Sequence, residues 1–523
     1  MGIYLNPGLE SLRISKNSEI YVDKSMLISY LHKVIDTESR FVCVSRPRRF
    51  GKTMAGNMIA AYYSKDCDSK AIFSDMKISK DPSFEKCLNK FNVIKLDINP
   101  MFREAMMKKE KLSELITKKI VSELSISFPL IGISYEDYIA DAILKINQKT
   151  HDKFIFIIDE YDVVIRENSD KDILDDYLNF LIILFKNADL APVISLVYLT
   201  GIIPIVRDKV QSKLNNFEEF TMVDAYPLEE YAGFSVKETQ DLCIQYGMDF
   251  DEIKRWYDGY NLNGVELYSP RSVVTAIKKK KCSDYWTQTG SYEALRSFIL
   301  MNMEGIKDDI ISMISGARVH VNVLKFLNTM NSLHTKDDVF TYLIHIGYLA
   351  YDGETEECYI PNYEIKTEWI NSIEDSADYK SVMELVNGSK ELLHATWNMD
   401  SEAVARAIEK THMEVTSNLT YNNEGSFQSA IRLSYFYADS YYTVVSELPS
   451  GKGFADIVFI PYVPDKPAII VELKRNTSVQ SAIDQIRQKE YPDILKKYKD
   501  NLLLVGVSYS EKSKKHSAII EKA

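Results

Sequence analysis

Residues 41–53, FVCVSRPRRFGKT, decide the fold of this chain. The apolar FVCVS predicts a buried strand, and RPRRFGKT (46–53) predicts a short loop that closes with Gly51, Lys52 and Thr53 at the start of a helix. This order brings backbone N–H groups and the positive end of a helix dipole together. The stretch therefore predicts a phosphate-binding loop, in which Lys52 contacts the outer phosphates of a nucleotide and Thr53 binds Mg²⁺.

A second apolar strand, KFIFIID at residues 153–159, ends in Asp159 and is followed by Glu160. Open α/β sheets bind ligands at the carboxyl ends of their strands. We expect Asp159 to bind Mg²⁺ through water and Glu160 to polarise the attacking water. A third strand, VISLVYLT, ends in Thr200, whose hydroxyl is expected beside the γ-phosphate and the water.

Three arginines lie in the loop, and Arg46 stands where the GxxxxGK[ST] pattern has its first glycine. Their planar guanidinium groups suit phosphate oxygens, but they equally suit ion pairs between domains or subunits. Arg46, Arg48 and Arg49 cannot all reach one triphosphate, so we expect one or two to do so. We assign Arg46 and Arg49 to the nucleotide, together with Gly51.

The first 225 residues alternate apolar strands with helical patterns, which predicts an α/β domain with a parallel sheet covered on both faces. Residues 228–395 read as mainly helical, with no continuous strand before about Tyr342 and a strand–turn–strand near Asp352-Gly353. A small mixed αβ unit begins near Met399, with the predicted strands YTVVSEL, FADIVFIPY, AIIVELK and NLLLVGVSY. We therefore predict four parts: an ATPase core (1–227), a helical lid (228–290), a mainly helical linker (291–398) and a last domain (399–523).

Composition narrows the classes of function. The 523 residues carry a net charge of −12, which argues against a protein coated in nucleic acid along its length. From Lys474 onward, however, 11 Lys and Arg stand against 6 Asp and Glu, which suits either phosphates or a solvated surface. The six cysteines form no CxxC pair, and no signal peptide or membrane span is evident, so we expect reduced thiols, no zinc site, no membrane and a cytoplasmic location.

The last domain carries carboxylates and a lysine on two strands. Asp456 follows a glycine-rich turn, and IIVELK places Glu472 and Lys474 on one strand face. Two carboxylates and a lysine on one face can bind Mg²⁺ and activate water, although exposed strands often carry such residues without a catalytic role. Glu424 precedes them in a helical segment, and Gln485 and Tyr491 follow in another, where both could also simply cap and pack their helix.

The N-terminal motifs resemble a bacterial and archaeal family of AAA-like ATPases. The resemblance covers roughly the first 290 residues and rests on YVDKS (21–25), SRPRRFGKT (45–53), IIDEYD (157–162), LTG (199–201), WYDGY (256–260) and YWTQTG (285–290). It implies ATP as the ligand and a loop with Arg-Pro-Arg-Arg-Phe in place of the opening glycine. The chain departs from the family at SPRS (269–272), where Arg271 is a candidate lid arginine.

The order Glu, Asp, Glu-x-Lys, Gln, Tyr over about residues 418–508 resembles the PD-(D/E)xK nuclease superfamily. The resemblance implies a restriction-endonuclease-like fold in which Asp456 and Glu472 bind metal and Lys474 activates water. It also implies that Glu424 assists, while Gln485 and Tyr491 support the site or the substrate.

The sequence thus predicts an ATPase joined to a Mg²⁺-dependent nuclease acting on nucleic acid, with DNA favoured and a homo-oligomer left open. Two alternatives remain at this point. The chain could be a nucleotide-dependent switch or scaffold whose last domain binds a partner without cutting. It could also be an ATPase acting on a protein, with the nuclease fold reused for docking.

Overall fold

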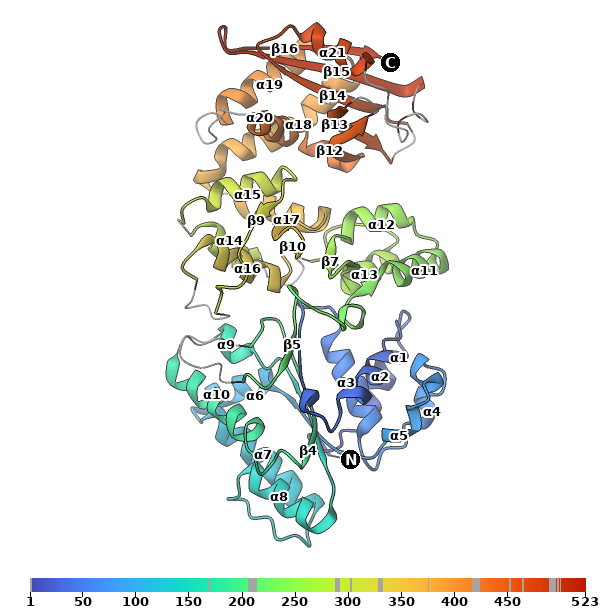
Figure 1. Cartoon of the computed structure of the whole chain (residues 1–523), viewed down its shortest axis with the longest axis vertical. Coiled ribbons are helices and arrows are strands. Elements are labelled where there is room, and N and C mark those ends of the chain that lie inside the picture. Colours follow the sequence, from blue (N-terminus) through green and yellow to red (C-terminus); the bar gives the residue numbers. More distant parts are fainter. Residues whose placement is uncertain are drawn as a thin grey trace. The chain divides into compact units, whose positions relative to one another are not determined.

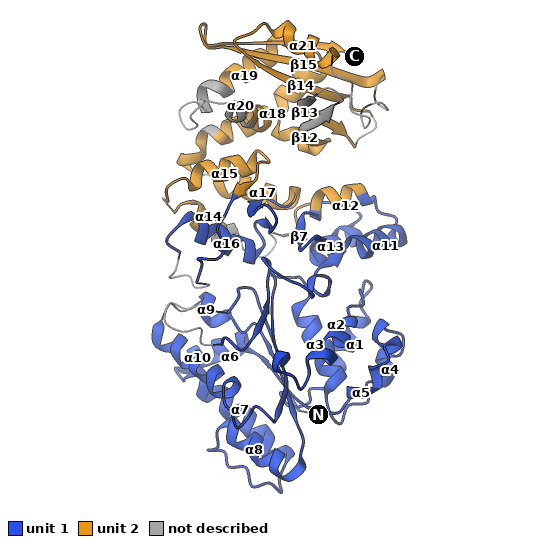
Figure 2. Ribbon diagram, in the orientation of Figure 1, with its two compact units in different colours: residues 1–250, 257–282, 320–361 blue, residues 251–256, 283–319, 362–523 orange. Residues whose placement is uncertain are grey.

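The computed structural model describes residues 2–167, 170–205, 214–286, 292–301, 303–327, 333–374, 376–415, 424–450, 453–462, 465–488, 495, 498 and 500–523. They form two compact units that interleave along the chain (Figure 2). Unit 1 comprises Met1–Phe250, Tyr257–Cys282 and His320–Pro361, and unit 2 comprises Asp251–Trp256, Ser283–Val319 and Asn362–Ala523. The four-part linear division predicted above does not contain this interleaving, and its boundaries stay a prediction.

Unit 1 is built on a five-stranded sheet of order β2-β3-β4-β1-β5 in which all neighbours run parallel. Its strands are β1 (Phe41–Ser45), β2 (Asn92–Asp97), β3 (Phe154–Asp159), β4 (Ile194–Gly201) and β5 (Glu218–Phe220). Every residue of β1, β3 and β4 is buried, as expected of strands covered on both faces. The predicted α/β fold class is confirmed.

Helices cover both faces of this sheet. Figure 1 shows α1–α5 on one side and α6–α10 on the other. The first group is α1 (Glu10–Lys16), α2 (Met26–Val34), α3 (Lys52–Tyr63), α4 (Lys70–Phe73) and α5 (Phe84–Cys87). The second is α6 (Ile98–Lys108), α7 (Leu112–Ser127), α8 (Ile139–Thr150), α9 (Val163–Glu167) and α10 (Lys171–Phe185). The parallel order with these crossovers brings the carboxyl ends of β1, β3 and β4 to one edge.

The expectation that no continuous strand precedes about Tyr342 missed a sheet of three short strands. Helices α11 (Val236–Tyr246) and α13 (Pro270–Lys279) accompany a small antiparallel sheet of β6 (Phe234–Ser235), β7 (Tyr260–Leu262) and β8 (Val265–Tyr268). Asn263 and Gly264 both have positive φ, so they turn the chain in two residues and pair the flanking segments. This Asn-Gly signal was present in the sequence.

The strand–turn–strand predicted near Asp352 is confirmed as β10 (Ala350–Asp352) and β11 (Glu357–Tyr359), which pair antiparallel. The residues immediately before it, LIHI, instead end helix α16 (Lys336–Ile346). Thr335 and Asp338 form a capping box at the start of this helix, which satisfies free N–H groups of its first turn.

Unit 2 ends in a five-stranded mixed sheet of order β12-β13-β14-β15-β16. The strands are β12 (Tyr442–Ser450), β13 (Gly453–Pro461), β14 (Ala468–Arg475), β15 (Leu502–Ser510) and β16 (Lys515–Lys522). Only β14 and β15 pair parallel, across helix α21 (Val479–Gln488). The other α-helices of the described part of the unit are most of α12 (Phe250–Tyr257), α14 (Tyr292–Ile299), α15 (Ile306–Ile314), α17 (Tyr363–Ile373), α18 (Lys380–Trp397), α19 (Ser401–Val415) and α20 (Glu424–Ser434). The sequence did not predict β16.

Alternation along β14 and β15 separates two cores in this sheet. Ile470 and Leu504 pack with Ile483 of α21 on one face. Val471 and Val505 pack on the other face with residues of α18, α19 and α20. The last domain is therefore a mixed αβ unit, as predicted, and its sheet lies between two helical layers.

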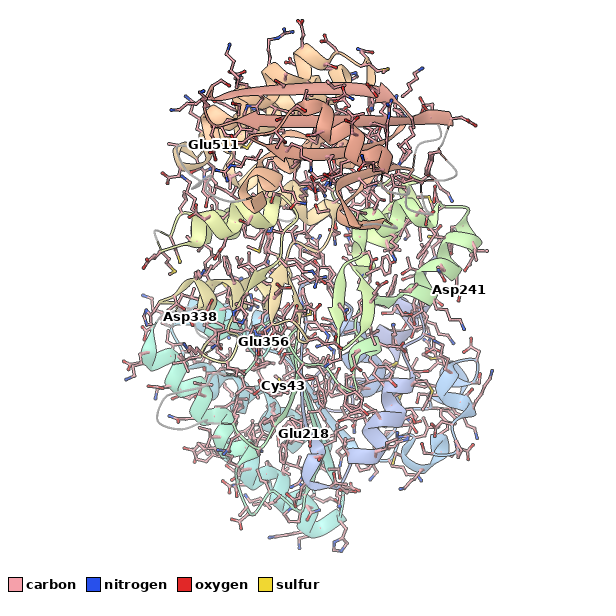
Figure 3. The ribbon with its side chains drawn as sticks, turned by 45° about the horizontal axis from the view of Figure 1, so that its top comes forward. Cys43, Glu218, Asp241, Asp338, Glu356 and Glu511 are labelled. Atoms are coloured by element: carbon pink, nitrogen blue, oxygen red, sulfur yellow. The ribbon has the colours of Figure 1, made fainter. Side chains whose placement is uncertain are left out.

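None of the six cysteines forms a disulfide, as predicted, and all six are buried. Cys43, labelled in Figure 3, lies in β1, where burial raises the pKa of its thiol. Among the described residues, no helix has the length and apolar character that a membrane crossing requires.

Candidate functional site

The phosphate-binding loop predicted from the sequence lies at the carboxyl edge of the unit 1 sheet. It follows β1 and ends at Gly51, which caps α3 with φ +90°, a left-handed conformation that glycine adopts without strain. Thr53 is exposed in the first turn of α3. The loop thus presents a hydroxyl beside a helix N-terminus, and this donor set suits a phosphate with Mg²⁺.

The Lys52 ammonium lies folded into the loop. Its Nζ donates to the carbonyl oxygens of Arg46 and Pro47, both at 2.8 Å, and the residue is buried. Burial lowers the pKa of Lys52 to about 8, against the opposing effect of nearby carboxylates, of which Asp162 contributes most. The lysine therefore has only neutral acceptors, which an anionic phosphate can replace.

Asp159 and Thr200 meet on adjacent strands. The Thr200 hydroxyl donates to Oδ1 of Asp159 at 2.5 Å, and both residues are almost completely buried. Glu160 follows with φ +50°, and its Oε2 accepts a 2.9 Å hydrogen bond from Nδ2 of Asn99. The turn after β3 thus directs two carboxylates differently, Asp159 toward β4 and Glu160 toward Asn99 at the start of α6.

The structure adds Asp97, to which the sequence analysis gave no role. It is the last residue of β2 and lies in register with Asp159. Burial, together with the charges of Asp159 and Glu160, raises the pKa of Asp97 to about 6. A carboxylate at the end of KLD was visible in the sequence, but its neighbour depends on the pairing of β2 with β3.

Arg46 occupies a position that does not suit a nucleotide ligand. It is fully buried, and its guanidinium donates to the carbonyl oxygens of Ser45, Phe220, Thr221 and Leu228 at 2.9–3.4 Å. Arg46 thereby ties the loop to the segment after β5. Arg48 is exposed, and Arg49 is partly exposed with φ +69°. We therefore leave Arg46 out of the proposed nucleotide site, and the role of Arg49 stays a prediction.

The substitution Arg46→Met tests this structural role. It leaves buried carbonyl oxygens without a donor, at a cost of about 1–3 kcal/mol for each. We expect a lower melting temperature for unit 1 and an unchanged nucleotide affinity of the folded protein, measured by calorimetry and by titration with a fluorescent ATP analogue. A variant of full stability that no longer binds nucleotide would return Arg46 to the phosphate site.

The WYDGY motif contacts the loop through its last tyrosine. The rings of Tyr260 and Phe50 lie edge to face with centroids 5.4 Å apart, and the Tyr260 hydroxyl donates to the carbonyl of Gly347 at 2.7 Å. The Gly233 N–H also donates to the Phe50 carbonyl at 3.0 Å. Phe50 directly precedes Gly51 and Lys52, so these contacts hold the loop from the side of the small β6-β8-β7 sheet.

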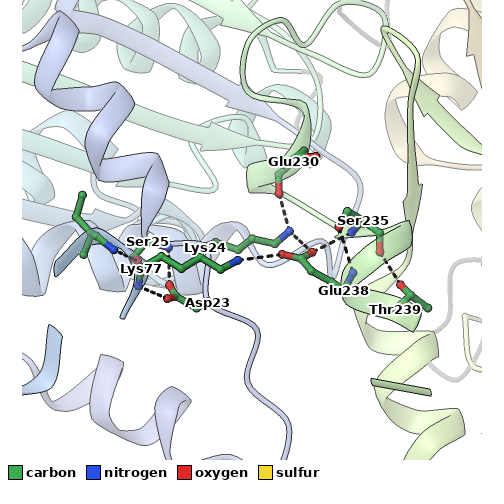
Figure 4. Close-up of polar contacts among 9 residues, drawn as sticks. Asp23, Lys24, Ser25, Lys77, Glu230, Ser235, Glu238 and Thr239 are labelled. Carbon is green, nitrogen blue, oxygen red and sulfur yellow. Dashed lines mark hydrogen bonds and ion pairs between the residues drawn. The ribbon is translucent and has the colours of Figure 1, made fainter. Parts of the chain in front are cut away.

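The YVDKS motif joins the N-terminal segment to the start of α11 (Figure 4). Lys24 Nζ donates to Oε2 of Glu238 at 2.5 Å and to the carbonyl of Glu230 at 2.6 Å. Glu238 also completes a capping box with Ser235. The Asp23 carboxylate accepts from the N–H groups of Ser25 and Lys77. These bonds join segments that lie far apart in the sequence.

Because the side chains of Lys24 and Glu238 are each less than one-fifth exposed, removing one leaves the other charge poorly solvated. We expect Lys24→Met to lower the free energy of unfolding of unit 1 by about 3 kcal/mol. Urea denaturation followed by hydrogen exchange in unit 1 measures this loss. Lys77→Met is the matched control: its side chain is 57% exposed and its Nζ lies 3.9 Å from Glu238 Oε1, so the substitution should cost less than about 1 kcal/mol. Equal losses would contradict the assignment.

The strand register brings together the residues predicted in the last domain. Ile457 pairs with Val471, so the preceding Asp456 and the following Glu472 lie opposite each other on one face. Asp456 Oδ2 accepts the N–H of Leu473 at 2.7 Å, and Lys474 Nζ lies 3.2 Å from Glu472 Oε1. Glu472 is 1% exposed, so its carboxylate is held within the domain. Two carboxylates on one face, with a lysine beside them, suit a hydrated Mg²⁺.

Four further residues with predicted roles are Glu424, Tyr491, Gln485 and Arg271. Glu424 begins α20, but its side chain lies outside the described part, and Tyr491 lies outside the described residues altogether. Gln485 is partly exposed on α21, and Arg271 is exposed at the start of α13. Within the part of the chain that the structure describes, no three His, Cys, Asp or Glu side chains gather as a metal site.

Family models match one region in the N-terminal half of the chain and one near its C-terminus. Residues 9–211 match the family model described as Predicted AAA-ATPase, and residues 422–518 match that of the PD-(D/E)XK nuclease superfamily. An uncharacterized protein in the vnfD 5′ region of Azotobacter chroococcum mcd 1 is 22% identical over 278 residues, which are 52% of this chain and 51% of that protein. This chain thus spans about half the length of that curated relative.

Two solved structures are also similar. PCH-2 of C. elegans is 13% identical, with 48% of this chain and 47% of that chain covered and a TM-score of 0.21. The ORC1 protein of Aeropyrum pernix, solved in complex with DNA, is 10% identical, with 71% and 98% covered and a TM-score of 0.29. Similarities this low carry no argument here. The predicted fusion rests on the family models, and it is confirmed: the chain joins a region of the predicted AAA-ATPase family to a C-terminal region of the PD-(D/E)XK nuclease superfamily.

Proposed function

We propose that unit 1 binds and hydrolyses ATP with Mg²⁺, and that the C-terminal domain cleaves nucleic acid, with DNA the favoured substrate. The observation that carries the first part is the meeting of Lys52, Asp159, Glu160 and Thr200 at one sheet edge. Phosphoryl transfer needs little covalent chemistry from the protein. It needs phosphates held in place, charge neutralised and a water oriented.

Each residue has one task in this proposal. Lys52 exchanges the carbonyl oxygens of Arg46 and Pro47 for phosphate oxygens. Glu160 orients the attacking water and accepts its proton, while Asn99 holds the Glu160 carboxylate. Thr200 positions Asp159, which with Thr53 holds the metal that neutralises the developing charge.

In the C-terminal domain, Asp456 and Glu472 hold the metal and Lys474 positions water for attack on a phosphodiester. Support comes from their common face and from the superfamily match over residues 422–518. Bound metal lowers the pKa of water and stabilises charge on the phosphate.

One observation favours a second candidate function. The Glu472 carboxylate is buried, and Lys474 already neutralises it, so metal must compete with an internal ion pair. This favours a nucleotide-dependent switch or scaffold whose C-terminal domain binds a partner without cutting.

A single set of assays separates the two. Full-length protein is incubated with Mg²⁺ or Mn²⁺ and labelled single- and double-stranded DNA and RNA, with and without ATP, while phosphate release is followed. Turnover of ATP with metal-dependent cleavage, strongest on DNA, supports the proposal. Binding without cleavage at any metal concentration supports the switch, and absence of ATP turnover overturns the ATPase assignment.

A further inference from the structure

The carboxyl end of β14 leads from the proposed catalytic residues directly into a basic surface. Lys474 pairs with Ser508 across the parallel ladder, and the next pair is Arg475 with Tyr509. Strand β15 continues through Ser510 into the turn at residues 511–514 and returns as β16. Arg475 forms an ion pair with Glu511 in this turn, which fixes the turn to the end of β14. Glu511 is labelled in Figure 3.

The register determines which side chains share a face. Residues directly opposite each other in a ladder point to the same side of a sheet. Glu472 lies opposite Gly506 and Lys474 opposite Ser508. Ser508 in turn lies opposite Ser517, and Ser510 opposite Lys515. Lys515 and the Ser510 and Ser517 positions are therefore on the same face as Glu472 and Lys474.

Three lysines of this hairpin are available for a partner. Lys512, Lys514 and Lys515 are all exposed, and within the described part of the chain their side-chain ammonium groups have no hydrogen bond or ion pair. Glu511, the acidic residue of the turn, is paired with Arg475. Exposed hydroxyl groups at Ser513 and Ser517 alternate with the lysines. Lysine and serine are among the side chains that commonly contact phosphate and sugar in nucleic-acid complexes.

The separation of Lys474 and Lys515 suits two phosphates of one nucleic-acid strand. Lys515 is displaced from Lys474 by two residues along the strands, about 7 Å, and by two strands across the sheet, about 10 Å. The direct separation of the two positions is therefore about 12 Å. Each strand of duplex DNA rises about 3.4 Å per nucleotide along the helix axis, so this separation equals the axial rise of roughly three to four nucleotides. A strand with one phosphate at Lys474 can therefore bring another phosphate to Lys515.

We propose that Lys512, Lys514 and Lys515 of the β15–β16 hairpin bind the phosphate backbone of the nucleic acid, three to four nucleotides from the bond attacked at Asp456 and Glu472. This inference rests on the proposed nuclease function, which it deepens by locating the substrate strand. The contacts are to phosphates, so the hairpin sets affinity and direction but reads no sequence.

The test is the salt dependence of binding. Full-length protein carrying Asp456→Ala, which prevents cleavage, is titrated by fluorescence anisotropy against labelled single-stranded DNA from 50 to 300 mM NaCl. Removing three phosphate contacts in K512A/K514A/K515A should reduce the slope of log affinity against log salt by about 2. K512R/K514R/K515R retains the charge and should keep the wild-type slope.

The matched control removes the same charge from the opposite side of the sheet. Lys380 and Lys390 on α18 and Lys410 on α19 are exposed, and these helices cover the other face. K380A/K390A/K410A should leave the slope unchanged. An unchanged slope in the hairpin variant, or an equal reduction in this control, overturns the inference.

Cleavage by otherwise wild-type protein separates this inference from the proposed function. The hairpin variant should have a KM raised several-fold with an unchanged kcat, because Asp456, Glu472 and Lys474 are intact. Suppose that wild-type protein never cleaves, but the slope of log affinity against log salt falls in the hairpin variant and not in the control. Phosphate binding by the hairpin is then supported, and the nuclease proposal fails. If wild-type protein cleaves and the hairpin variant keeps the wild-type salt dependence and KM, only the inference about the hairpin fails. If wild-type protein does not bind nucleic acid, both fail.

Discussion

Lys52→Ala is expected to abolish ATP binding at micromolar nucleotide. The ammonium is the cation at the centre of the loop, and hydrogen bonds to charged groups contribute up to about 3 kcal/mol, a factor of roughly 100 in affinity. Because the Lys52 amine now bonds only to the loop's own carbonyl oxygens, its loss should affect nucleotide binding more than folding. Titration with a fluorescent ATP analogue measures the affinity, and calorimetry confirms that the variant is folded.

Glu160→Gln is the companion to this variant and should behave differently. The amide keeps the shape and the contact with Asn99 but cannot accept a proton, so nucleotide should bind with normal affinity while turnover falls about 10²–10⁴-fold. Phosphate release under saturating ATP measures the turnover. Undiminished hydrolysis would remove Glu160 from the catalytic role. Lys65→Ala, which affects a surface ion pair with Asp152, is a control that should change neither quantity.

Asp456→Ala is expected to end metal-dependent cleavage while ATP turnover survives. Loss of a metal ligand removes several kcal/mol of transition-state stabilisation, which corresponds to a decrease of roughly 10³-fold or more. Lys474→Ala should have a similar effect, with the added consequence that the buried Glu472 carboxylate loses its partner. Cleavage of labelled DNA in Mg²⁺, measured beside phosphate release on the same preparation, gives both activities.

Asp484→Asn is the matched control for the C-terminal site, since Asp484 is exposed on α21. It should cleave as the wild type does. A nuclease activity that survives Asp456→Ala would assign the cleavage to another site or to a contaminant. Loss of ATP turnover in the same variant would show instead that the substitution disturbs the whole chain.

Local patterns were sufficient for the parallel sheet and for most of the C-terminal strands. Residues 41–53 combine an apolar strand, a loop and a helix start, and each of these depends only on neighbouring residues. The helix predicted to follow the loop is α3, Lys52–Tyr63. Short strands gave weaker signals: β7 and β8 have three and four residues, too few for a clear period, although Asn263-Gly264 marked their turn.

Long-range pairing was beyond what the sequence could provide. Motif spacing put Arg46 on phosphate, but three of its four carbonyl acceptors come from residues 220–228, more than 170 positions away. Asp97 becomes a neighbour of Asp159 only because β2 pairs with β3. The Lys24–Glu238 ion pair also joins segments 214 residues apart, so no local pattern in the sequence indicates it.

By itself, then, the sequence determined which residues form the phosphate-binding loop and which strands end in carboxylates, because these depend on local periodicity and on residue chemistry. Only the tertiary structure decided that Arg46 faces inward and that Lys515 shares a face with Glu472 and Lys474. The physical reason is that buried charges and sheet registers are set by partners far along the chain, and a one-residue change of register would turn each of these side chains to the other face.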